Sequence, residues 1–216
     1  MIVSFAFLSR FPWVAHGFIP RWTPGGASPA RAEEKLTPHH VAMLRARGIS
    51  HGALALAEQI HGRDVALVAR GGEPPRAGAD GLATETPGVA LGIHVADCGA
   101  IYLVDPVRRA IALLHSGKRG TAAGIPEEGV STMARAFGSR PGDLVAALSP
   151  CIHACCYEVD FAAEILRRLA AAGVREVWRH PDCTACRPDR YDSYRRDKGR
   201  TGRMLAFLMI REMPLR

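Results

Sequence analysis

Three residues with reactive or metal-binding side chains share an unusual position in this sequence. His61, Cys98 and His115 each follow a short apolar segment, and a glycine comes within the next two residues. Two neutral imidazoles and one thiolate can hold a tetrahedral Zn²⁺ with one position left open, which is the ligand count of a catalytic zinc site. The same residues suit a metal-free site, with Cys98 as nucleophile and His115 as base. Spacing alone does not choose between these sites, or between them and ordinary burial in a core.

Short apolar segments bounded by glycine, proline or aspartate determine where these three residues lie. Such segments are typical of β-strands, and several are apolar throughout, as expected for strands covered on both faces. We predict strands over residues 3–8, 54–59, 65–69, 89–95, 101–104, 110–115, 144–148 and 204–210. His61, Cys98 and His115 then lie at strand ends, where open α/β sheets bind their ligands.

Three helices are predicted from their terminal residues. Thr37 is a good N-cap for a helix that begins at Pro38 and ends near Gly48. Two further helices are expected over residues 125–137 and 161–171, each closed by a glycine. Together with the strands, this order predicts a mixed α/β (α+β) fold. We expect one domain over residues 1–216, with a central mixed β-sheet flanked by helices.

Composition excludes several classes of protein. The 216-residue chain has a net charge of +7 and no apolar run near the roughly 20 residues that a membrane span needs. Its first residues lack the basic region of a signal peptide, so we expect a cytoplasmic protein with no membrane partner. Residues 187–203 hold six arginines and one lysine, but also three aspartates and no nucleic-acid-binding motif. A solvated charged face is favoured there over a nucleic-acid site, and a monomer is expected.

The six cysteines are expected to be reduced, because disulfide scaffolds belong mostly to small secreted chains. Cys98 stands apart from two groups, which are Cys151, Cys155 and Cys156, and the C-x-x-C pair Cys183 and Cys186. A site with four thiolates, from Cys151, Cys155, Cys183 and Cys186, is one alternative. Zinc knuckles usually have two C-x-x-C pairs and this chain has one, so packing is the favoured role for these residues.

Further motifs surround the three site residues. In chain order they are Gln59-Ile60-His61-Gly62, Ala79-Asp80-Gly81-Leu82, Ala96-Asp97-Cys98, His115-Ser116-Gly117-Lys118-Arg119-Gly120-Thr121, Cys155-Cys156-Tyr157-Glu158-Val159 and Ser193-Tyr194-Arg195-Arg196-Asp197. In this combination the chain resembles the YfiH/laccase-domain family, whose members are also called polyphenol oxidases or purine nucleoside phosphorylases. The resemblance extends over residues 14–210 of the sequence.

The resemblance implies one zinc ion held by His61, Cys98 and His115. It also implies phosphorolysis of adenosine, inosine, guanosine and methylthioadenosine, with phosphate as the second substrate, and hydrolytic deamination of adenosine. The older laccase label implies copper-dependent oxidation of phenols. A four-copper site needs many histidines, typically in His-x-His pairs, and this chain has nine histidines and no such pair. We therefore expect a single metal ion, with copper as the alternative to zinc.

Other motif residues are candidates for catalysis and binding. We predict that Asp97 acts with Cys98 and His115 in catalysis, either as general acid or base or by orienting a histidine ligand. Arg21 and Arg119 are candidates to hold phosphate, because guanidinium groups bind its oxygens in pairs. Gln59 is a candidate to bind the purine nucleoside.

Two segments depart from the family pattern. Lys118 stands where the family usually has tryptophan, and the first loop, residues 19–26, is longer than usual. Trp22 is a candidate to replace the lost aromatic surface. These changes affect the substrate wall and spare the metal ligands. A non-catalytic module that binds nucleoside or metal therefore remains an alternative.

Overall fold

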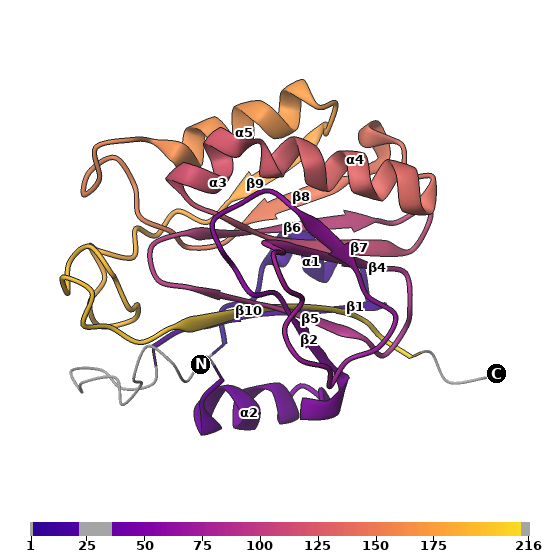
Figure 1. Cartoon of the computed structure of the whole chain (residues 1–216), viewed down its shortest axis with the longest axis horizontal. Helices are drawn as coiled ribbons and strands as arrows, with labels where there is room; N and C mark the ends of the chain where they lie inside the picture. Colours follow the sequence, from indigo (N-terminus) through magenta and orange to yellow (C-terminus); the bar gives the residue numbers. More distant parts are fainter. Residues whose placement is uncertain (1, 22–35, 213–216) are drawn as a thin grey trace.

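Two mixed β-sheets stack face to face at the centre of the structure, a computed structural model that describes residues 2–21 and 36–212 (Figure 1). The smaller sheet has the strand order β1 (Val14–Ile19), β10 (Met204–Ile210), β5 (Ala90–Val95) and β2 (Leu54–Leu56). The larger sheet has the order β3 (Val65–Leu67), β4 (Gly81–Thr84), β7 (Ala110–Ser116), β6 (Gly99–Asp105), β8 (Val145–Leu148) and β9 (Glu176–Arg179). The predicted mixed α/β class is confirmed, with the strands divided between two sheets.

Helices cover the outer face of each sheet. Three of them lie on the larger sheet, namely α3 (Lys118–Ala123), α4 (Ile125–Phe137) and α5 (Phe161–Ala171). Helix α2 (Pro38–Arg45) lies on the smaller sheet, and the short helix α1 (Ala6–Ser9) precedes β1. The layer order is therefore helices, large sheet, small sheet, helix.

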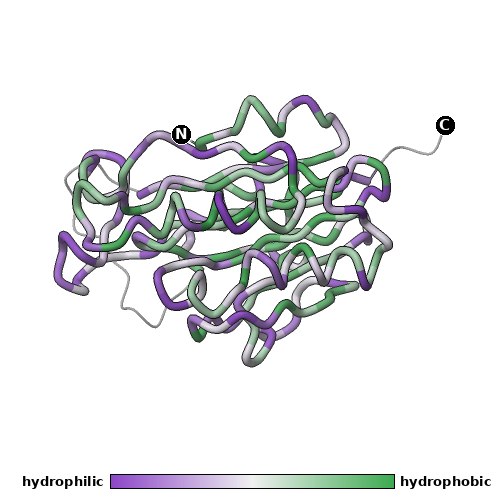
Figure 2. Tube along the Cα trace, turned by 90° about the horizontal axis from the view of Figure 1, so that it is seen from above, coloured by the Kyte–Doolittle hydropathy of each residue, from purple (hydrophilic) through white to green (hydrophobic). Residues whose placement is uncertain are grey.

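Alternating side chains on the strands fill three apolar layers. In β7, Ile111 and Leu113 belong to the cluster between the two sheets, whereas Ala112 and Leu114 belong to the cluster under α4 and α5. Strand β10 does the same between the central cluster and a third cluster under α2. Figure 2 shows apolar residues along the strands and hydrophilic residues at the outer turns. Burial on both faces explains why these strands are apolar throughout.

The predicted elements agree with the structure in most places. The helices over residues 125–137 and 161–171 are confirmed, and the Thr37 side chain accepts a hydrogen bond from the His40 amide as an N-cap should. The strand over residues 3–8 is wrong, because only Val3 pairs, in a single bridge, before α1 begins. Phe5 and Leu8 are both buried, and their spacing suits one helical turn.

Several elements were missed because they are short or of mixed polarity. Strands β1, β4 and β9 and helix α3 lie outside the predicted segments. Two 3₁₀ turns, His51–Ala53 and Pro141–Asp143, complete the described structure. Among the described residues, no helix is both long and apolar enough to cross a membrane.

Candidate metal centre and active site

The turn that joins the two sheets brings His61, Cys98 and His115 together. Cys98 ends the turn from β5 to β6, and His115 lies near the end of β7, where Ser116 pairs with Gly99 at the start of β6. His61 comes from the loop after β2. The potential ligand atoms of the three residues lie within 4.8 Å of one another. The structure thus forms the predicted cluster from three segments that are distant in sequence.

Asp80 is the main residue of this site that sequence reasoning did not single out. Its carboxylate is fully buried and accepts a hydrogen bond from His115 Nδ1 at 2.8 Å. It also accepts bonds from the backbone amides of Ile60 at 3.1 Å, His61 at 2.9 Å and Gly62 at 2.7 Å. With Nδ1 engaged, Nε2 of His115 is the ring nitrogen left for a metal ion. The orienting contact considered for Asp97 is therefore made by Asp80, which the Ala79-Asp80-Gly81-Leu82 motif contained.

Left-handed backbone conformations concentrate at this site. Gln59, His61 and Asp97 have φ angles of 65°, 64° and 79°, respectively. A non-glycine residue in this region costs roughly 1–3 kcal/mol and persists only where its surroundings hold it. The hydrogen bonds that Asp80 accepts from the loop at residues 60–62 supply such a hold on His61.

The two buried ionisable groups at the centre stabilise each other. Burial opposes ionisation of the Cys98 thiol, but hydrogen bonds from His115 and His61 outweigh it and lower its pKa to about 6. Burial also disfavours the imidazolium of His115, yet the hydrogen bonds to Asp80 and Cys98 raise its pKa to about 9. Both shifts favour the ionised pair, a thiolate beside an imidazolium. A metal ion that binds here displaces the imidazolium proton.

These residues open onto a cavity of about 1090 Å³. Six of the predicted site residues line it: Gln59, His61, Asp97, Cys98, His115 and Arg119. Its wall also has cationic side chains, namely Lys118, Arg195, Lys198 and Arg203, and the aromatic residues Tyr157, Phe161 and Tyr194. A cationic and aromatic wall suits a ligand that combines negative charge with a flat ring.

The two predicted phosphate-binding arginines lie in different surroundings. Arg119 is exposed in the cavity wall and makes no hydrogen bond or ion pair with another described residue. Arg21 is absent from the described cavity lining. It pairs with Asp192 at 3.6 Å and donates a hydrogen bond to the Pro188 carbonyl. The structure therefore brings Arg119, and not Arg21, to the cavity that His61, Cys98 and His115 line, while Trp22 lies outside the described residues.

Gln59 lines the cavity, but the backbone occupies its side-chain amide. The Gln59 Nε2 donates to the His94 carbonyl at 2.6 Å, and its Oε1 accepts from the His94 amide at 2.9 Å. His94 is buried in β5 and also lines the cavity. The contacts of Gln59 are those of a residue that ties the His61 loop to β5.

Asp97 uses both of its carboxylate oxygens within the protein. One oxygen accepts from Thr184 Oγ1 at 2.6 Å, and the other accepts from Ser193 Oγ at 3.0 Å and the Arg195 amide at 2.7 Å. These contacts hold the segment that carries Tyr194 and Arg195 against the cavity. Sequence reasoning quoted that segment as a motif but gave its residues no role.

The fold and the site together define a mixed α/β protein with a two-histidine, one-cysteine centre in a cationic cavity. The family model described as multi-copper polyphenol oxidoreductase laccase matches residues 31–164 and 159–211. The chain belongs to this laccase-domain family, as its motifs indicated.

Relatives and solved structures agree with that assignment. The purine nucleoside phosphorylase YlmD of Geobacillus stearothermophilus is 33% identical over 195 residues, which cover 72% of this chain and 71% of the relative. A purine nucleoside phosphorylase of Deinococcus radiodurans is 35% identical over 202 residues, covering 79% and 78%. The crystal structure of YlmD from Geobacillus stearothermophilus superposes with a TM-score of 0.85 at 27% identity, covering 94% of this chain and 93% of that one.

Proposed function

We propose that this chain is a zinc-dependent purine nucleoside phosphorylase. The observation that carries the proposal is the convergence of His61, Cys98 and His115, oriented by Asp80, in the wall of a cavity with cationic and aromatic side chains. The names of the relatives support the reaction. The donor set supports the metal, because two imidazoles and a thiolate are borderline-soft ligands that suit zinc.

Within this proposal, His61, Cys98 and His115 hold the metal ion. When bound, zinc supplies a Lewis acid that polarises an oxygen atom in the cavity. Asp80 keeps His115 in the tautomer that presents Nε2, and it fixes the loop that carries His61. A copper ion would use the same three ligands, but the described residues contain no second cluster with histidine in it. A four-copper centre is therefore not part of the proposal.

Phosphorolysis breaks the bond between the anomeric carbon of ribose and the purine nitrogen, and forms a bond from that carbon to a phosphate oxygen. The incoming phosphate needs cationic partners. Arg119 is unengaged in the described structure, and Arg195 and Lys198 line the same cavity. The purine needs a flat apolar surface, which Tyr157 and Tyr194 provide. These assignments place phosphate and base within one cavity.

Asp97 and Gln59 act on positioning in this proposal. Asp97 holds Thr184, Ser193 and the Arg195 amide, so it fixes the phosphate-binding wall and does not transfer a proton. Gln59 could bind substrate only by giving up a bond to the His94 backbone. Adenosine deamination would use the same cavity, with water forming a bond to C6 of the purine and ammonia leaving, and it is a side activity in this proposal.

A metal-free cysteine hydrolase is the second candidate, and one observation favours it. Asp80, His115 and Cys98 form a chain of hydrogen bonds in the order acid, imidazole and thiol, and the Cys98 pKa of about 6 supplies a thiolate. Both candidates use the same atoms. Metal content and sensitivity to alkylation distinguish them.

One assay tests the proposed function. Protein of measured metal content is incubated with adenosine and phosphate, and the products are separated by chromatography. Adenine with ribose-1-phosphate is expected, with inosine as a minor product when phosphate is omitted. The Cys98→Ala variant should lose activity and the zinc ion held with His61 and His115, whereas Cys151→Ala, which removes a buried thiol outside the cavity lining, should keep both.

Three results would count against the proposal. Full activity on amides or esters without metal, abolished by alkylation of Cys98, would establish the hydrolase. Oxidation of phenols by the copper-loaded protein, without phosphorolysis, would favour the laccase label. Nucleoside binding without any product would identify a binding module.

A further inference from the structure

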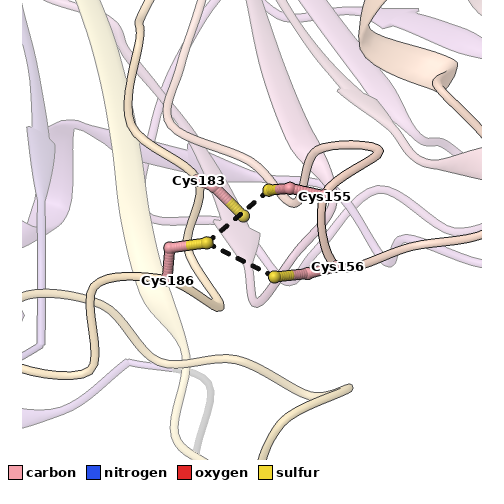
Figure 3. Close-up of side chains that lie close together, drawn as sticks. All are labelled: Cys155, Cys156, Cys183 and Cys186. Carbon is pink, nitrogen blue, oxygen red and sulfur yellow. Dashed lines mark hydrogen bonds between the residues drawn. The ribbon is translucent and has the colours of Figure 1, made fainter.

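Four cysteines outside the active-site cavity converge on one point. Cys155 and Cys156 lie in the loop between β8 and α5, and Cys183 and Cys186 lie in the segment between β9 and β10. Figure 3 shows their four sulfur atoms pointing toward one another. Cys186 Sγ lies 3.5 Å from Cys155 Sγ and 3.3 Å from Cys156 Sγ, and all four sulfurs are within 4.8 Å of one another.

The topology of the larger sheet explains this convergence. Strands β8 and β9 are parallel, so the two segments leave the sheet at the same edge. The pairing continues beyond the strands, where Cys151 and Cys183 form an isolated parallel bridge and the Thr184 amide donates to the Cys151 carbonyl at 3.0 Å. Cys151 is held by this backbone pairing and is buried, so its thiol is not one of the four. Cys156, and not the Cys151 of the four-thiolate alternative considered from the sequence, completes the cluster.

We propose that Cys155, Cys156, Cys183 and Cys186 bind a second zinc ion as four thiolates. Zinc bound to four thiolates has Zn–S bonds of about 2.3 Å in a tetrahedron, which places the sulfurs about 3.8 Å apart. The two short separations, 3.5 Å and 3.3 Å, lie slightly below that value, and all four sulfurs lie within 4.8 Å of one another. The His153 amide also donates to Cys183 Sγ at 3.4 Å, a contact that stabilises a thiolate.

A disulfide accounts less well for this arrangement. Cys186 lies almost equally close to two adjacent cysteines and can bond to only one of them, which would leave two thiols over. Cys155 and Cys186 are both exposed, and free thiols in that position are open to oxidation. One soft divalent ion engages all four sulfurs at once.

The proposed ion has a structural role, because four protein ligands leave no open position. It would tie together two segments of the cavity wall. Tyr157 follows Cys156 and lines the cavity, and Thr184, which lies between Cys183 and Cys186, donates to Asp97. The ion therefore supports the wall from outside the cavity, and its binding does not depend on the proposed activity.

Counting zinc in variants tests the second site. Each protein is purified with a reductant, equilibrated with zinc alone and analysed for metal per chain. We expect two zinc ions in the wild type, one in Cys98→Ala and one in the double variant Cys155→Ser/Cys186→Ser. Equal zinc content in the wild type and the double variant would overturn the proposal. Activity is not needed for this count, so a failure of the proposed nucleoside reaction gives a different result.

X-ray absorption on the remaining zinc of Cys98→Ala gives a direct readout of its ligands. The proposal expects four sulfur neighbours at about 2.3 Å and no nitrogen. A shell containing nitrogen would overturn it. Alkylation of the wild type keeps the test independent of variant folding. Bound zinc should slow alkylation of all four thiols. Equal alkylation rates with and without zinc would refute the site. A disulfide to Cys186 that persists in protein purified with a reductant would refute it as well.

Discussion

Replacing Asp80 by asparagine changes one carboxylate oxygen behind His115 into an amide NH₂ group. The carboxylate accepts four hydrogen bonds. Oδ1 takes those from His115 Nδ1 and the His61 amide, and Oδ2 takes those from the Ile60 and Gly62 amides. Asparagine keeps one oxygen and turns the other into a donor group. In either orientation, two of the donors, which are buried at His115 and partly buried in the loop, therefore face an amide NH₂.

The magnitude follows from those lost bonds. Leaving a fully buried donor without an acceptor costs roughly 1–3 kcal/mol, and the loop donors are only partly buried, so the loss of two bonds should lower the free energy of unfolding by about 2 kcal/mol. Removing the carboxylate behind a metal-binding histidine typically reduces metal affinity by about 10- to 100-fold. We expect Asp80→Asn to show both effects.

Asp105→Asn is a matched control. Asp105 is also fully buried at a strand end, but its Oδ1 accepts both of its bonds, from the amides of Val107 and Arg108. Its Oδ2 has no hydrogen-bond partner among the described residues. Asparagine at this position can keep both bonds, so its zinc affinity should equal that of the wild type.

Two measurements separate the effects. Denaturant unfolding of the metal-free proteins gives the change in stability, and zinc titration against a competing chelator gives the change in affinity. The titration uses a Cys155→Ser/Cys186→Ser background, so that one site is read. If Asp80→Asn kept wild-type affinity and stability, the assignment of Asp80 as the residue that positions His115 would be refuted.

Three further predictions concern other residues. A Cβ at residue 117 would overlap Cys98 Sγ, so Gly117→Ala should lose the zinc ion held by His61, Cys98 and His115. A Cβ at residue 52 meets no atom, so Gly52→Ala should keep that ion, and metal analysis checks both variants. Arg119→Ala should raise the KM for phosphate by about 10- to 100-fold, which corresponds to the loss of one hydrogen bond to a charged group. An unchanged KM would show that Arg119 does not bind phosphate. Burial lowers the pKa of His16 from 6.5 to about 4. Between these pH values the unfolded chain therefore binds a proton at His16 that the folded chain does not. Stability should therefore fall as the pH drops through that range, by up to about 3 kcal/mol, and His16→Gln should flatten this part of the profile in denaturant titrations; an unchanged profile would contradict it.

Local sequence signals predicted many of the helices and strands and pointed to the candidate site. Thr37, the glycines that close α4 and α5, and the continuous apolar strands predicted their elements because caps and burial patterns act over a few residues. The motif context of His61, Cys98 and His115 pointed to one site and to the family. The strand predicted over residues 3–8 is wrong because a run of apolar residues fits a strand or one buried helical turn equally well.

Only the tertiary structure decided which residues meet across the chain. It assigned the carboxylate behind His115 to Asp80 and not to Asp97, because the pairing of β4 with β7 places Asp80 beside that ring. It placed Arg21 in an ion pair with Asp192, away from the described cavity lining. It also exchanged Cys151 for Cys156 in the four-cysteine cluster, because the parallel exit of β8 and β9 buries one thiol and gathers the other four. Spacing along the chain carries no record of such contacts, since they depend on strand order and register.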